Sequence, residues 1–183
     1  SPIMPGAAHL ARQMLWYERE WPERFARARW MLGAPQYWAW RLSGVGATEL
    51  TYLAAQSHLW NVPERRYAAI VERHGWQAKL PPIQPAWKVL ARLKPELAHR
   101  HGLSPDIEVL CGLHDSSANF YRYQQADLED LAVISTGTWI VGMSDAFDPE
   151  ALAVTSGMTW NADVHGRPLS GMLAMGGREF AAI

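Results

Sequence analysis

The chain has 183 residues, of which 49% are hydrophobic and 19% charged, and its formal net charge at pH 7 is −1. This composition is typical of a folded globular protein. The basic residues are scattered, so the charge favours neither a nucleic-acid partner nor an anionic membrane. No apolar stretch reaches membrane-spanning length, and the single Cys111 allows no internal disulfide, which fits a reducing cytoplasm.

The first half of the chain is predicted to form short helices with short connections. Apolar side chains recur at helical spacing, Pro22 can open a helix, and Gly44 can end one. Most of the ten tryptophans lie in this half, where we expect them in core and interface packing. Helices are expected over residues 7–19, 22–31, 36–42 and 63–73, whereas residues 48–60 are ambiguous.

The character of the sequence changes after residue 80. Repeated prolines predict a loop-rich passage, which ends in an almost continuously apolar run over residues 107–113. Such a run is typical of a strand inside a sheet that is covered on both faces. A helix is expected to begin over residues 117–125.

The last third contains two apolar runs around a Thr-Gly-Thr turn. This pattern predicts a β-hairpin over residues 128–144. Residues 146–160 are weakly patterned, residues 161–168 form a predicted turn, and residues 175–183 resemble a glycine turn that opens a helix.

The first motif whose side chains could act in catalysis or binding is Gly-Leu-His-Asp-Ser-Ser at residues 112–117. In open α/β sheets, ligands gather at the carboxyl ends of strands, where Asp115 is expected. A carboxylate there can accept a proton from a hydroxyl or hold a metal. It can equally cap the helix that follows, and the pattern alone does not decide between these roles.

Two glycine turns further on could bind phosphate. In Ser-Thr-Gly-Thr-Trp, residues 135–139, backbone N–H groups and threonine hydroxyls offer donors to an anion. Gly176 and Gly177 precede a predicted helix, where a nucleotide can approach the backbone. Taken singly, a plain hairpin and a packing turn explain these motifs better than a ligand does.

In this order, the three motifs resemble the FGGY carbohydrate kinases. The resemblance includes the first half, where a helix is followed by Trp-Pro-Glu at residues 21–23 and by Tyr-x-x-x-Arg-Leu-Ser-Gly at residues 37–44. It therefore covers essentially the whole chain. Within the family, the fuculokinase- and rhamnulokinase-like ketose kinases are the most similar subgroup.

The resemblance implies an α/β fold of the actin-like, ribonuclease H-like ATPase type. Residues 1–125 would end a sugar-binding first domain, and residues 126–183 would begin an ATP-binding second domain. It implies ATP-dependent phosphorylation of a sugar, a ketose or a related polyol, with ATP and Mg²⁺ in a cytoplasmic enzyme whose relatives are commonly dimers.

The resemblance also assigns roles to individual residues. Asp115 corresponds to the catalytic base and, with His114 and Ser116, to the sugar site. The nucleotide contacts correspond to Thr136, Gly137, Thr138, Gly176 and Gly177. The family's initial Asp-Gly-Thr hairpin and its later adenosine-binding segment are absent here, so we expect an internal segment of a longer kinase that is inactive alone.

Other functions are less well supported by the same residues. A serine hydrolase built from the consecutive residues 114–116 is disfavoured, because neighbours on an extended chain point in alternating directions. A zinc site at His99, His101 and His114 lacks a cysteine pair. His58 could reach a sugar, although a packed or solvent-facing imidazole explains it better. A kinase-fold protein that binds a sugar or a partner without catalysis remains an alternative.

Overall fold

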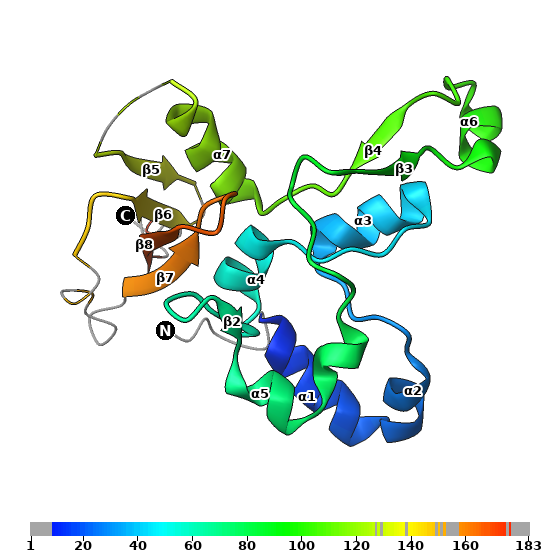
Figure 1. Ribbon diagram of the computed structural model, residues 1–183, viewed down its shortest axis with the longest axis horizontal. Coiled ribbons are helices and arrows are strands. Elements are labelled where there is room, and N and C mark those ends of the chain that lie inside the picture. The colour runs from blue at the N-terminus through cyan, green and yellow to red at the C-terminus, as the bar shows by residue number, and fades with distance from the viewer. Residues whose placement is uncertain are drawn as a thin grey trace.

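The computed structural model describes residues 9–126, 128, 130–137, 139–148, 150, 152, 158–174 and 176 (Figure 1). The helices are α1 (Leu10–Glu20), α2 (Pro22–Arg27), α3 (Ala34–Ser43), α4 (Leu50–Gln56), α5 (Ala69–Arg73), the 3₁₀ turn η1 (Trp76–Lys79), α6 (Pro95–His101) and α7 (Asp115–Gln124). The strands are β1 (Trp60–Asn61), β2 (Arg66–Tyr67), β3 (Val89–Arg92), β4 (Glu108–Leu110), β5 (Ala132–Thr136), β6 (Ile140–Ser144), β7 (Met158–Ala162) and β8 (Pro168–Ala174).

Helices α2 and α3 carry proline or glycine signals and form where the sequence predicts them. Helix α2 has Pro22 in its first turn, and α3 ends at Gly44, which adopts the left-handed conformation with φ +82°. The helix predicted over residues 22–31 nevertheless stops at Arg27. Beyond it the Met31 N–H donates to the Lys79 carbonyl, and Trp30 packs so tightly on Gly46 that a Cβ there would lie 2.4 Å from the indole.

The helix predicted over residues 63–73 is wrong in its first half. The chain instead forms the short hairpin β1–β2, in which Trp60 pairs with Tyr67 and their rings meet edge to face. Helix α5 begins only at Ala69. The ambiguous residues 48–60 contain α4.

The passage after residue 80 also contains more structure than predicted, because β3 and α6 lie within it. Strand β4 pairs antiparallel with β3 in a two-stranded sheet. Val109 is buried in a small cluster with Ala39 of α3, whereas Leu110 is 49% exposed. Side chains alternate along a strand, so only one face of this hairpin is covered here. The expectation of a strand covered on both faces is therefore wrong for the described residues.

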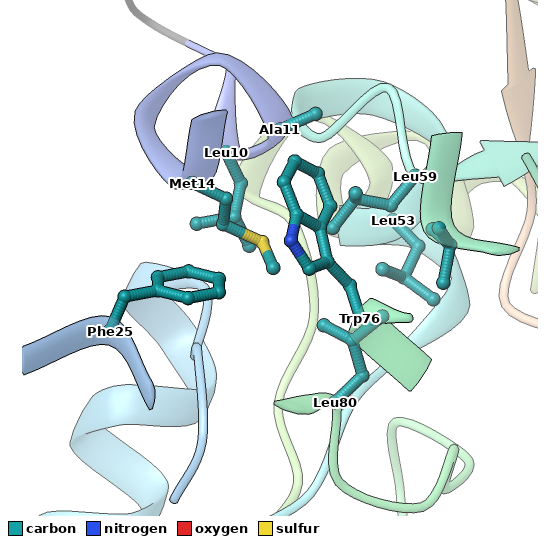
Figure 2. Packing of buried hydrophobic residues seen from close by; sticks show 9 residues of the cluster. Leu10, Ala11, Met14, Phe25, Leu53, Leu59, Trp76 and Leu80 are labelled. Carbon is teal, nitrogen blue, oxygen red and sulfur yellow. The ribbon is translucent and has the colours of Figure 1, made fainter. Parts of the chain in front are cut away.

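The main core of the first part surrounds Trp76, which is 1% exposed (Figure 2). Its indole packs among side chains from α1 and α4, including Met14 and Leu53, and its Nε1–H donates to the Glu18 Oε1 at 3.1 Å. The tryptophans differ widely in exposure, since Trp16 and Trp38 are 55% and 63% exposed.

Every helix in the described part of the chain is too short or too polar to span a bilayer.

The predicted hairpin over residues 128–144 is confirmed as β5–β6, with Thr136 opposite Ile140. It belongs to an antiparallel sheet in the order β5-β6-β8-β7. Strand β7 lies in the weakly patterned stretch and was not predicted. Helix α7 covers this sheet through Phe120, which is buried with Leu131, Met143 and Leu169, and α4 packs against β7 (Figure 1). The starts of α4 and α7 are thereby brought near the sheet.

Candidate active site

Asp115 is the first residue of α7, two residues earlier than the predicted helix start. The connection from β4 turns at Gly112, whose φ of +75° is strained for any residue with a side chain. The N-cap position is occupied by His114, and no side chain caps this helix. The Asp115 side chain is 92% exposed, and its Oδ1 accepts the Ser116 N–H at 2.6 Å. The carboxylate also benefits from the positive end of the helix dipole.

His114 is buried beside Asp115, at 7% exposure. Its Nδ1 lies 3.1 Å from Ser117 Oγ, and its Nε2 lies 3.2 Å from Asp115 Oδ1. Burial lowers the pKa of His114, and the Asp115 charge opposes this only in part. A neutral ring that accepts the Ser117 hydroxyl proton at Nδ1 carries its own proton on Nε2, the nitrogen that lies 3.2 Å from Asp115 Oδ1.

A small recess of about 70 Å³, open at its mouth, lies between the helical part and the sheet. One wall consists of His9, Ala54, Ala55, His58, His114 and Ser116, and the other of Val141, Met143, Thr159, Trp160, Asn161, Met172 and Leu173. Two of the predicted sugar-site residues, His114 and Ser116, therefore line one cavity, and Asp115 stands between them in the sequence. Imidazole, hydroxyl and amide groups on a partly apolar wall suit a small polyhydroxylated ligand.

Two further histidines in this recess stack on each other. The rings of His9 and His58 lie 3.7 Å apart at their centroids. Burial is the main cause that lowers the pKa of both, in His9 to about 4. The sequence favours a packed or solvent-facing His58 over a sugar contact. His58 does pack on His9, but it also forms part of the wall.

The Thr-Gly-Thr turn exposes both Thr136 and Gly137. The Gly137 N–H donates to the Trp139 carbonyl at 3.0 Å, and among the described residues a Cβ at Gly137 would meet only that oxygen, at 3.8 Å. The space beside this glycine is therefore open. Ser135 lines a small cavity together with Ser116, so the hairpin adjoins the start of α7. Thr138 lies outside the described residues.

The second glycine turn is only partly described. A Cβ at Gly176 would lie 2.3 Å from Ile140 Cδ1, so close packing accounts for a glycine at this position. Gly177 and the predicted helix after it lie outside the described residues.

Two alternative sites find no support in the geometry. The ring of His114 contacts Ser117 and Asp115, while Ser116 Oγ lies 3.3 Å from Asp115 Oδ1, so the hydrolase triad is not assembled. His99 and His101 belong to α6, away from His114 on the chain. Within the described ranges, no three His, Cys, Asp or Glu side chains are grouped as metal ligands.

Sequence patterns missed a buried polar group behind the Asp115 loop. Thr51 and Glu49 lie at the start of α4 and are 0% and 1% exposed. The Thr51 hydroxyl bonds to both Glu49 and the His114 backbone, and the Gln36 Nε2 donates to the Gly112 carbonyl at 3.3 Å. The weak signal in the sequence is Thr-Glu-Leu-Thr, polar residues directly before an apolar helix.

Comparisons with known proteins agree with this arrangement. The N-terminal domain model of the FGGY family of carbohydrate kinases matches residues 2–120, and the C-terminal domain model of carbohydrate kinase FGGY matches residues 128–183. The structure of a carbohydrate kinase from Novosphingobium aromaticivorans has a TM-score of 0.88 and 37% identity, over 100% of this chain and 41% of that one. No curated protein matches.

Two more distant structures show the fold alone. Ligand-bound xylulose kinase from Lactobacillus acidophilus has a TM-score of 0.69 and 19% identity, over 89% of this chain and 33% of its own. Plasmodium falciparum glycerol kinase with ADP has a TM-score of 0.70 and 14% identity, over 93% of this chain and 36% of its own.

The matches confirm the predicted actin-like ATPase fold, while the predicted subgroup remains a prediction. With family models matching along nearly its whole length, the chain belongs to the FGGY family of carbohydrate kinases.

Proposed function

We propose that the protein containing this chain transfers a phosphoryl group from ATP to a sugar hydroxyl, on a ketose or related polyol, with Asp115 as the general base. One observation carries the proposal. An exposed carboxylate at a helix start adjoins a recess lined by imidazole, hydroxyl and amide groups. The chain spans 41% of the length of the Novosphingobium kinase, so the activity proposed is that of the full-length protein.

Each site residue of this chain has a proposed role in the reaction. Asp115 accepts the proton of the attacking hydroxyl as the new bond develops. His114 and Ser116 bind the sugar from the helical wall, and Thr159 and Asn161 face them from the sheet wall. A sugar held between the two walls is shielded from water, which would otherwise compete as the phosphoryl acceptor.

The Thr-Gly-Thr turn fits a phosphate group. Bound ATP supplies the phosphoryl group, and Mg²⁺ neutralises its charge. Thr136 and Gly137 are exposed, and the space beside Gly137 is open, so an anion can approach the Thr136 hydroxyl. Thr138, Gly176 and Gly177 belong to the same proposed nucleotide site.

The test is a panel of sugars with the full-length protein, with ADP release as the readout. We expect Asp115→Ala to lower kcat by about 10²–10⁴-fold, the usual contribution of a general base, while sugar binding persists. Asp106→Asn serves as the matched control, because Asp106 is exposed on the β3–β4 side and pairs with Arg92. Activity of Asp115→Ala within about tenfold of wild type would show that another group is the base. Sugar binding without ADP release would support the non-catalytic alternative.

The remaining expectations belong to the same proposal. A boundary near residue 125 is supported by the two family matches, which leave residues 121–127 between them. A cytoplasmic homodimer, and inactivity of these 183 residues alone, also stay predictions.

A further inference from the structure

We infer that Thr51 and Ser117 are positioning residues for Asp115 and that both act through His114. The inference rests on the proposed role of Asp115 as the base. It concerns how that carboxylate is held, because an exposed aspartate at a helix start has no packing of its own to fix its rotamer.

The first support acts on the backbone of His114. The Thr51 hydroxyl donates to Glu49 Oε2 at 2.6 Å and accepts the His114 N–H at 3.0 Å. The Glu49 Oε2 also accepts the Tyr52 N–H at 3.1 Å, which anchors the pair to the first turn of α4. Since Thr51 is fully buried, the peptide that leads into Asp115 is fastened to a rigid helix start.

The second support acts on the imidazole of His114. Ser117 is 2% exposed, and its Oγ lies 3.1 Å from the His114 Nδ1. A hydroxyl proton donated to Nδ1 selects the tautomer with the proton on Nε2, 3.2 Å from Asp115 Oδ1. The opposite tautomer would turn a lone pair toward the carboxylate. Ser117 thereby selects the ring state that can donate to Asp115.

These two supports together hold the base in one orientation. Thr51 holds the backbone of His114 in place, and Ser117 determines which ring nitrogen carries the proton. A displacement of about 1 Å at a reacting group can cost about 10²-fold in rate, so a loosened carboxylate should lower turnover rather than sugar binding. The arrangement parallels the partners that orient a ligand or base from behind in many enzymes.

The experiment uses the full-length protein with four variants. Thr51→Val keeps the shape but removes the hydroxyl, Thr51→Ser keeps the hydroxyl, and Ser117→Ala removes the imidazole partner. Ser43→Ala is the matched control, because Ser43 Oγ makes a comparable bond, to the Ala39 carbonyl at 2.6 Å, within α3. The readouts are kcat, KM for the sugar, the melting temperature, and the ¹⁵N shifts of labelled histidine.

We expect Thr51→Val and Ser117→Ala to lower kcat by about tenfold or more, with KM within about threefold of wild type. Thr51→Ser and Ser43→Ala should stay near wild type. In wild type, the ¹⁵N shifts should report His114 with its proton on Nε2. In an Asp115→Ala background, Thr51→Val should cause little further loss, because its effect passes through the missing carboxylate.

Several outcomes would overturn the inference. Wild-type kcat in Ser117→Ala and Thr51→Val, an Nδ1–H tautomer of His114, or an equal loss in the Asp115→Ala background would each do so. If Thr51→Val fails to fold, Ser117→Ala and the tautomer decide alone. An inactive wild-type protein, or full activity of Asp115→Ala, would instead refute the proposed function, so the two failures are distinguishable.

Discussion

The stacked histidines of the recess predict a loss of stability in acid. His9 is 3% exposed, and its Nδ1 has no hydrogen-bond partner among the described residues. Burial, followed by the nearby His58 and Arg12 charges, lowers its pKa from 6.5 to about 4. The folded state therefore binds fewer protons than the unfolded state between these values. The stability that the protein keeps because His9 is neutral is fully present above pH 6.5 and is lost as the pH falls toward 4.

The magnitude follows from the two pKa values. At about 1.4 kcal/mol per pH unit for one proton, His9 alone costs about 3 kcal/mol over the whole window. Between pH 6 and pH 4.5 the expected loss is about 2 kcal/mol, since each state is partly protonated at the limits. Burial also lowers the pKa values of His58 and His114, which act in the same direction.

The assay compares wild type with His9→Phe, which keeps a ring to stack on His58 but cannot titrate. Urea unfolding of the full-length protein, followed by tryptophan fluorescence, measures the free energy of unfolding at pH 6 and pH 4.5. Wild type should lose about 2 kcal/mol more than the variant between these values. From pH 8 to pH 7.5 the free energies of unfolding of the two proteins should change in parallel. Parallel behaviour between pH 6 and pH 4.5 as well would refute the pKa assigned to His9.

Two further predictions concern the segment that leads to Asp115. Gly112→Ala should destabilise the protein by about 1–2 kcal/mol because φ is +75° there, whereas Gly137→Ala, with open space and no positive φ, should cost less in thermal unfolding. Cys111 is fully buried, and burial, with the Glu49 charge, raises its pKa to about 12. A thiol reagent should therefore label Cys111 only after unfolding, and rapid labelling of the native protein would contradict this burial.

The parts of the fold that sequence could predict depend on local signals. Pro22 begins one helix and Gly44 ends another through their own backbone conformations, and the Thr-Gly-Thr turn joins two apolar runs that pair directly. Two failures occur where a tertiary contact or a strand pairing overrides a helical pattern. Trp30 packs on Gly46, and Trp60 pairs with Tyr67, so two stretches with helical patterns take other conformations.

The same distinction between local signals and contacts across the chain applies to the candidate site. The order of Asp115 and the hairpin is visible in the sequence, because each follows an apolar run. The supports from outside this loop are not, because Thr51 and His114 are 63 positions apart and Gln36 and Gly112 are 76 apart. Ser117, by contrast, lies within the same motif as His114. Periodicity reports that a residue is buried. It carries no information about which buried polar atoms meet.

The sequence around Asp115 fits two roles. A carboxylate at a helix start is favourable whether it caps the helix or serves as a base, so the motif fits both roles. A cap accepts N–H groups two or three residues ahead. Here His114 occupies the N-cap position, and Asp115 accepts from the next residue while facing a buried imidazole. The described contacts therefore do not include the hydrogen bonds of a cap. The imidazole, itself held by Thr51 and Ser117, supports the proposed role of Asp115 as the base.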